Sequence, residues 1–184
     1  YYDGIVQGID PATGEVGASV KVGDSPRALA YDGTRLWVAN YSDGIMQAIY
    51  PAAGKVGVSI TVGNVLSALA YDGTQLWAAN DLDDTVTAIN PVKGDVGMPL
   101  KVGGNPNALA YDGTRLWVAN FTGTVQAIDP KTREAGATVP ISTGPHALAY
   151  DGARPWVANI DYGTMQAIDP ATGEAGASVP VSSG

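Results

Sequence analysis

The sequence contains no cysteine, and among its 184 residues it has a single histidine, His146. Without cysteine there is no disulfide, no thiolate zinc site and no cysteine nucleophile. With one histidine, the chain cannot build a two-histidine metal site or a pair of imidazole groups for acid–base catalysis. The sequence therefore indicates no catalytic residue, no cofactor and no metal ion.

Basic residues are also scarce. Ten Lys and Arg face 18 Asp and Glu, which gives a net charge of -8. Nucleic acid is not an expected partner, because binding to a phosphate backbone needs clustered Lys and Arg. No apolar run approaches the roughly 20 residues of a membrane helix, so no membrane span is expected. The first residues, YYDGIVQGID, also lack the basic and apolar regions of a signal peptide.

What the sequence does have is an internal repeat. The nine residues DGTRLWVAN stand at 32–40 and again at 112–120, with near copies at 72–80 and 151–159. A second phrase, typified by MQAIDPATGEAGASV at 165–179, occurs five times with the same period. The four tryptophans mark the spacing, which is 40, 40 and 39 residues. A period of this length indicates a repeat architecture.

Each unit of about 40 residues has room for four strands and four short turns. The expected strands, in order, carry sequences such as ALAY at 28–31, LWVAN at 36–40, TVQAI at 124–128 and GASVKV at 17–22. Asp-Gly between the first two predicts a type I′ turn, in which both residues have positive φ. In DPATGE, after the third strand, we expect Asp to cap backbone N–H groups and Gly to be left-handed. No window shows the apolar period of a helix.

Four-stranded sheets that are apolar on both faces fit blades stacked around an axis. The sequence therefore predicts an all-β fold, a β-propeller of four-stranded antiparallel blades with a 40-residue repeat. The chain supplies four pairs of first and second strands but five pairs of third and fourth strands, which makes 4.5 blades. We expect one domain or fragment over 1–184, with a half blade at 1–24 and blades at 25–64, 65–104, 105–143 and 144–184.

The unpaired half blade has consequences for assembly. It suggests that the chain is part of a five- to seven-bladed ring, closed by further sequence. Alternatively, another molecule fills the gap, since an unpaired strand edge recruits partners. Self-association through the half blade is one form of this alternative.

Several residues carry a resemblance to a known family. LWVAN, a short polar loop, TVQAIDPATG and then V-G-x-x-P-x-A-L-A resemble the YVTN-type repeat of bacterial β-propellers, which is similar to NHL-type repeats. The likeness covers essentially the whole chain. It implies a propeller and suggests an extracytoplasmic or secreted location. The repeat is more distantly similar to streptogramin lyases, which use histidine and acidic residues over a metal, a set that this chain does not display.

Positions that recur in every unit are explained by the blade itself. The tryptophans are therefore expected in the structural core: Trp37, Trp77, Trp117 and Trp156. The asparagine that ends each WVAN is expected to form a turn by hydrogen bonding to its own backbone. These asparagines are Asn40, Asn80, Asn120 and Asn159.

Positions that differ between the units are not fixed by the blade structure and can therefore carry a function. The loops after the second strand vary (41–44, 81–84, 121–123 and 160–163), as do the segments before and within the first strand (23–28, 63–68, 103–108 and 142–147). We call these segments the variable loop end, and loops on a rigid scaffold usually carry binding groups. Its candidate ligand-binding residues are Arg27, Tyr41, Asp43, Asn64, Asp81, Asp83, Asp84, Asn105, Asn107, Phe121, His146, Asp161 and Tyr162.

Aromatic rings beside carboxylates and amides can stack on a sugar and hydrogen-bond its hydroxyls. The sequence favours a non-enzymatic scaffold or binding module for a protein or glycan. The alternative is a metal-assisted lyase or hydrolase of the streptogramin-lyase type, with its site at the mouth of the central channel. A third reading is a purely structural surface repeat. The acidic run Asp81, Asp83 and Asp84 lacks the D-x-D-x-D-G signature of a calcium loop, so it predicts no metal site.

Overall fold

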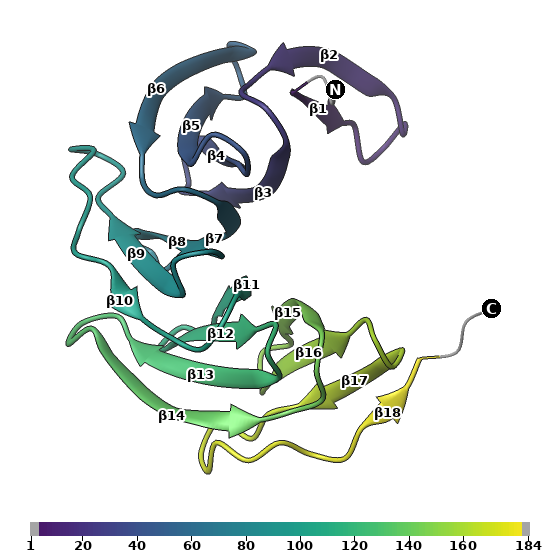
Figure 1. The fold of residues 1–184 in the computed structure, drawn as a ribbon. Coiled ribbons are helices and arrows are strands. Elements are labelled where there is room, and N and C mark those ends of the chain that lie inside the picture. The colour runs from purple at the N-terminus through teal and green to yellow at the C-terminus, as the bar shows by residue number, and fades with distance from the viewer. Residues whose placement is uncertain (1–3, 182–184) are drawn as a thin grey trace.

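The computed structural model describes residues 4–181 and contains 18 strands and no helix in that range. The strands form four four-stranded antiparallel sheets and one two-stranded hairpin (Figure 1). This arrangement confirms the predicted all-β propeller class. Residues 1–3 and 182–184, the outer limits of the expected first and last units, lie outside the described residues.

The strands follow the repeat closely. The N-terminal hairpin consists of β1 (Ile5–Ile9) and β2 (Val16–Lys21). The first two sheets are β3 (Pro26–Tyr31), β4 (Leu36–Asn40), β5 (Ile45–Tyr50), β6 (Lys55–Thr61), then β7 (Leu66–Tyr71), β8 (Leu76–Asn80), β9 (Thr85–Ile89), β10 (Leu100–Lys101). The last two are β11 (Pro106–Tyr111), β12 (Leu116–Asn120), β13 (Thr124–Asp129), β14 (Glu134–Pro140), then β15 (Pro145–Tyr150), β16 (Pro155–Asn159), β17 (Thr164–Ala167), β18 (Val179–Pro180).

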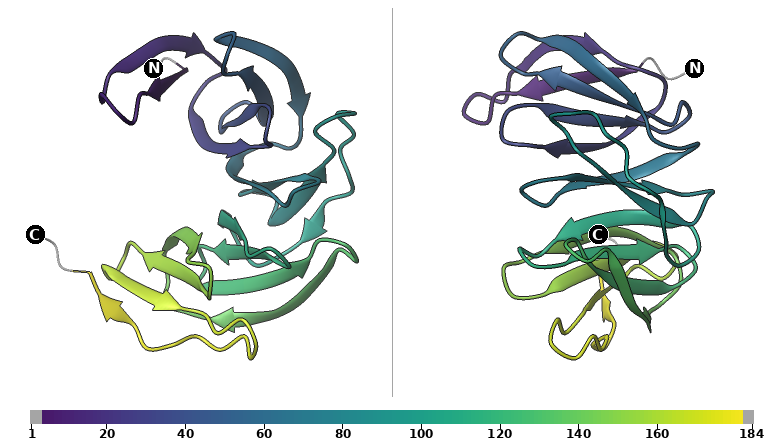
Figure 2. Two further views of the ribbon diagram at one scale, coloured as in Figure 1. Left: turned by 180° about the vertical axis from the view of Figure 1, so that it is seen from behind. Right: turned by 90° about the vertical axis from the view of Figure 1, so that its left-hand side faces the viewer.

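The sheets are blades arranged side by side around an arc that is open on one side (Figures 1 and 2). In each blade the strands pair in chain order, so the first strand of each blade faces the axis and the fourth lies outside. The β1–β2 hairpin and the last blade lie at the two ends of the arc. The inner strands β3, β7, β11 and β15 therefore define the centre of the molecule.

Tryptophan side chains fill the space between consecutive blades. Trp37, on β4, lies in a cluster with Leu66, Leu69 and Ile89 of the following blade. Trp77 and Trp117 occupy the equivalent places one and two blades further on. All three are buried, with at most 1% of their surface exposed.

The fourth tryptophan differs from the others. Trp156 is only half-buried, because each indole is covered by the blade that follows it, and no blade follows β15–β18 in the described residues. Its ring keeps the hydrogen bond that the other three make. The same residue type is therefore core in three blades and partly exposed in the fourth.

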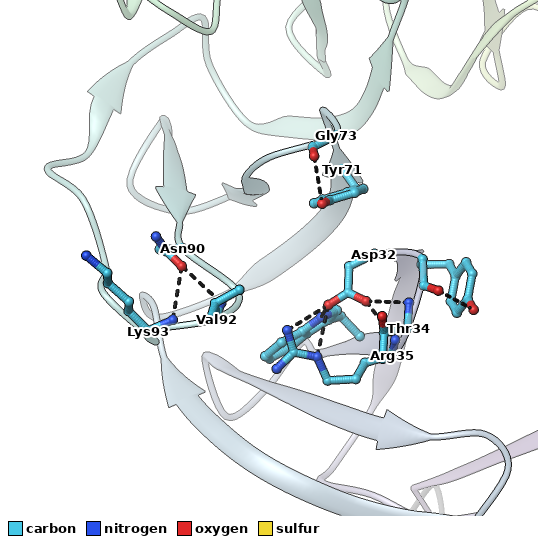
Figure 3. A network of polar contacts seen from close by, with 11 residues as sticks. Asp32, Thr34, Arg35, Tyr71, Gly73, Asn90, Val92 and Lys93 are labelled. Atoms are coloured by element: carbon cyan, nitrogen blue, oxygen red, sulfur yellow. Dashed lines mark hydrogen bonds and ion pairs between the residues drawn. The ribbon is translucent and has the colours of Figure 1, made fainter.

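The turn between the first two strands anchors the indole. Asp32 Oδ1 accepts hydrogen bonds from the backbone N–H groups of Thr34 and Arg35, at 2.9 and 2.6 Å, and Oδ2 accepts one from Trp37 Nε1 at 2.8 Å (Figure 3). The Tyr31 hydroxyl donates to the carbonyl of Gly33 at 2.8 Å. The bonds from the indole and backbone to Asp recur in every blade; the other three indole–carboxylate pairs are Trp77–Asp72, Trp117–Asp112 and Trp156–Asp151.

This geometry corrects the predicted type I′ turn. Tyr31 pairs with Leu36, so four residues, not two, connect the strands. Only Gly33 has a positive φ, of 90°. The aspartate is conformationally ordinary, and it contributes a carboxylate that caps the turn and holds the tryptophan.

The turn between the third and fourth strands forms as expected. Asn90 Oδ1 accepts the backbone N–H groups of Val92 and Lys93, each at 3.0 Å (Figure 3). Gly94 follows with a φ of 78°. In the next blade Arg133 takes the glycine position and adopts the left-handed conformation itself, with a φ of 61°.

Hydrogen bonds to the turn aspartates lower their pKa values. At Asp151, the backbone N–H of Arg154 and the indole N–H of Trp156 lower the pKa to about 2. Burial raises the pKa of Asp32, Asp72 and Asp112, but the hydrogen bonds from the indole and the backbone outweigh it, and the net shift is downward.

These shifts predict acid sensitivity. The folded-state pKa values lie below the unfolded value of about 3.9, so the stabilisation is fully present above that value and is lost as the pH falls through the folded values. We expect the urea concentration at the midpoint of unfolding to decrease as the pH is lowered from about 4 to about 2. The urea midpoint of the Asp72→Asn variant should decrease less over this pH range, because the variant has already lost one such carboxylate. Equal falls in the two proteins would contradict this assignment.

The asparagines of the WVAN motif also need correction. Asn40 is fully buried and donates from Nδ2 to Gln47 Oε1 on the adjacent strand, at 2.9 Å, rather than to its own backbone. Asn80 donates to Thr87 and Asn120 to Thr124 in the same way. Asn159 reaches Gln166. These asparagines are therefore cross-strand links inside the blade and not turn formers.

Candidate functional site

The second residue of each inner strand lies at the axis. These residues are Arg27, Ser67, Asn107 and His146, on β3, β7, β11 and β15. All four line one cavity of about 270 Å³, which we call the axial cavity. The next residue on each strand is an alanine, and these four alanines line the cavity as well. The small alanine side chains leave space in the cavity next to the four polar residues, which we call the axial layer. Each blade contributes a different polar group to this layer.

Arg27 supplies a positive charge to this layer. Its guanidinium carbon lies 4.6 Å from the centre of the Tyr41 ring, a distance at which a cation is attracted to an aromatic face. The Tyr41 hydroxyl in turn donates to Asp81 Oδ2 at 3.3 Å. Arg27 is exposed and forms no ion pair with a carboxylate within residues 4–181. Its charge is therefore available to a ligand.

Asn107 supplies an unsatisfied acceptor. The residue is 9% exposed, and its Oδ1 has no hydrogen-bond partner among the described residues. A buried polar atom without a partner costs about 1–3 kcal/mol. Ser67 is also buried, and its hydroxyl donates to the carbonyl oxygens of Pro106 and Ala79, at 2.5 and 3.3 Å. His146 also lines the cavity and is exposed.

Most other candidates hold the loops together. Asp43 Oδ2 accepts the backbone N–H of Asp24 at 2.9 Å, and Asp84 Oδ1 accepts that of Asn105 at 2.8 Å. These bonds tie the loop after a second strand to the segment before a first strand. Their carboxylates are thus engaged in loop structure.

The remaining loop candidates are either in contact with another loop residue or exposed as single rings. Asn64 donates to both oxygens of Asp83, at 3.2 and 3.3 Å, and is itself exposed. Phe121 and Tyr162 are 42% and 66% exposed, and the Asp161 carboxylate lies against Gly144. The structure brings Arg27, Asn107 and His146 to one cavity, with Tyr41 and Asp81 behind Arg27, and it leaves Phe121 and Tyr162 as separate exposed rings.

Sequence reasoning missed Ser67. The signal was present, because Arg27, Ser67, Asn107 and His146 occupy the same place in successive units, at spacings of 40, 40 and 39. A comparison of units position by position would have placed all four on one layer.

The described residues 4–181 contain no group of three or more His, Cys, Asp or Glu side chains placed to hold a metal ion. They also contain no helix with the length and apolar character needed to cross a membrane.

Comparison with known proteins identifies the fold alone. No protein-family model matches the chain, and no curated protein matches its sequence. A solved structure, the hydrazine synthase of Kuenenia stuttgartiensis, superimposes with a TM-score of 0.76 at 21% sequence identity. The match covers 85% of this chain and 49% of that one, so this chain spans about half the length of the matched structure. The likeness supports a fold of the β-propeller type.

Proposed function

We propose that this protein is a non-enzymatic binding module that holds a glycan in the axial cavity, at the variable loop end of the propeller. The observation that carries the proposal is the axial layer, in which four blades of nearly identical sequence present four different polar side chains to one space. The repeat resembles that of bacterial YVTN-type propellers, and on this resemblance we propose an extracytoplasmic location.

The groups in the axial cavity suit a sugar. An arginine, an amide, a hydroxyl and an imidazole offer donors and acceptors in several directions, as sugar hydroxyl groups require. The volume of about 270 Å³ is near the lower end of the range for ligand pockets, about 300–1,000 Å³. The free oxygen of Asn107 would accept a hydrogen bond from a sugar hydroxyl, and the Arg27 guanidinium suits a ring oxygen or a carboxylate.

The other readings have less support. A protein ligand would also use the variable loop end, but the polar groups converge on a small cavity rather than on a broad apolar surface. For the lyase or hydrolase alternative, no observation on the described residues gathers metal ligands around His146.

Binding to a glycan panel, followed by calorimetric titration of the best sugar, tests this proposal. Arg27→Ala and Asn107→Ala should each weaken binding by about tenfold or more, because a hydrogen bond to a charged group or a buried unsatisfied atom contributes about 1–3 kcal/mol. The control is Asn90→Ala, at the opposite end of the blade, which should bind like the wild type.

Two results would overturn the proposal. One is a sugar whose affinity is unchanged by both axial variants. The other is the absence of any glycan ligand together with capture of a protein partner that depends on Phe121 or Tyr162, which would assign the face to protein binding.

A further inference from the structure

The first hairpin has an open edge on its inner side. Strand β1 pairs with β2 and with no other strand in the described residues, whereas each of the other third strands, β5, β9, β13 and β17, also pairs with a second strand. The half blade therefore lacks the two strands nearest the axis. An edge of this kind is a template for a further strand.

The half blade is nevertheless built like the outer half of a complete blade. Val6 pairs with Val20 and Gln7 with Ser19, as Met46 pairs with Ile60 and Gln47 with Ser59 forty residues later. Gln7 Nε2 donates to Ser19 Oγ at 2.9 Å, and Gln47 Nε2 donates to Ser59 Oγ at 3.1 Å. The inner edge of β1 is thus equivalent to the edge of β5 that receives β4.

A place for an indole is preserved beside this edge. The cluster that contains Trp37 includes nine other buried residues, and all of them except Ala39 have a counterpart forty positions earlier in the sequence: Met46, Ala48, Ile60, Leu66, Leu69, Leu76, Ala78 and Ile89. The residues forty positions earlier are Val6, Gly8, Val20, Pro26, Leu29, Leu36, Val38 and Ile49. All eight of these line two cavities beside β1, of about 240 and 270 Å³. We call them the indole socket, because their counterparts surround a tryptophan and they do not.

Two residues of the indole socket are more exposed than their counterparts in the next two blades. Leu29 is 51% exposed, whereas its counterparts Leu69 and Leu109 are 7% and 8% exposed. Leu36 is half-buried, although Leu76 and Leu116 are fully buried. Leu29 and Leu36, whose counterparts are core in the next two blades, are therefore partly open to solvent, whereas Val38 and Ile49 of the same socket are buried.

We propose that the β1 edge and the indole socket bind a β-hairpin with the sequence of this repeat's own first and second strands, typified by residues 105–120, NPNALAYDGTRLWVAN. Its second strand adds antiparallel to β1 in the register of β4 on β5, and its tryptophan fills the socket. Its final asparagine donates to Gln7 as Asn40 donates to Gln47. Its first strand lies beside β3, as β3 lies beside β7.

The repeat makes a covalent test possible. Tyr1-Tyr2-Asp3-Gly4 matches Tyr41-Ser42-Asp43-Gly44, the loop that joins β4 to β5, so the sequence of residues 105–120 can be placed directly before Tyr1. We expect this extended chain to melt about 5 °C or more above the original chain, because it covers apolar side chains that are now exposed. The same extension with alanine in place of its tryptophan should show little of this gain.

A second arm supplies the hairpin as a separate synthetic peptide. The peptide should bind the 184-residue chain in a 1:1 ratio, and its tryptophan-to-alanine form should bind at least tenfold more weakly. Leu29→Asp, a change at an exposed site of the socket, should abolish binding. Leu82→Asp, at an exposed loop position of another blade, should leave it unchanged.

The proposal is overturned if the two extended chains melt at the same temperature, since the indole would then have no socket. It is also overturned if the 184-residue chain forms a dimer in sedimentation that is abolished by Leu29→Asp and persists in the extended chain. That result would assign the edge to a second copy of this protein.

Discussion

Replacing Trp77 by alanine is expected to lower the free energy of unfolding by about 3–5 kcal/mol, the cost of removing a large aromatic side chain from a packed core. Trp77 is fully buried between its own blade and the next, where it packs with Leu109, Leu116 and Ile128. The change would therefore open a cavity between two blades. Urea unfolding at neutral pH, followed by far-ultraviolet circular dichroism, measures it.

Trp156→Ala is the matched control for this prediction. Trp156 occupies the same position in its blade and makes the same hydrogen bond to an aspartate, but it is only half-buried. We expect its loss to cost clearly less than that of Trp77. Equal costs would show that the covering blade contributes little to the stability of each indole.

The second large effect is expected from Asp72→Ala. Asp72 accepts hydrogen bonds from the Trp77 indole at 2.8 Å and from the backbone N–H groups of Gln75 and Thr74. Its removal leaves a buried indole N–H without an acceptor, and hydrogen bonds to charged groups contribute about 1.5–3 kcal/mol each. A loss of about 2–3 kcal/mol is therefore expected in the same urea experiment.

A double-mutant cycle separates the indole bond from the rest of the turn. In a Trp77→Phe background there is no indole N–H, so Asp72→Ala should cost less than in the wild type. Asp95→Ala, at an exposed position on the same blade, serves as the control and should cost little. An Asp72→Ala effect that is the same in both backgrounds would contradict the role assigned to the indole bond.

The period of the sequence was sufficient to predict the blades. Four strands per unit follow from unit length and from turn residues at fixed places, and both are local properties. The details that sequence reasoning missed involve contacts across strands. Asn40 reaches Gln47 on the neighbouring strand, and Asp32 reaches the indole of Trp37 rather than adopting a positive φ.

Contacts between blades were beyond sequence reasoning altogether. The guanidinium of Arg133 lies 5.9 Å from the centre of the Trp77 ring, although the two residues are separated by more than one full repeat. In the same way, the loop carboxylates of Asp43 and Asp84 could be recognised as polar and variable, but their hydrogen bonds to neighbouring backbone depend on how two loops meet. Three of the four axial residues, Arg27, Asn107 and His146, could be named from the sequence because they lie in segments that vary between units.

Each buried tryptophan packs against the blade that follows its own in the sequence, so the row of blades is not symmetric from end to end. Every unit depends for its shielding on the one after it, so the two ends of the chain are not equivalent. In a nearest-neighbour description of repeat proteins, detachment of β15–β18 would uncover Trp117, while detachment of the β1–β2 hairpin would uncover no tryptophan in the described residues. Fraying at the carboxyl end should thus redshift the intrinsic fluorescence, and fraying at the amino end should be spectroscopically silent.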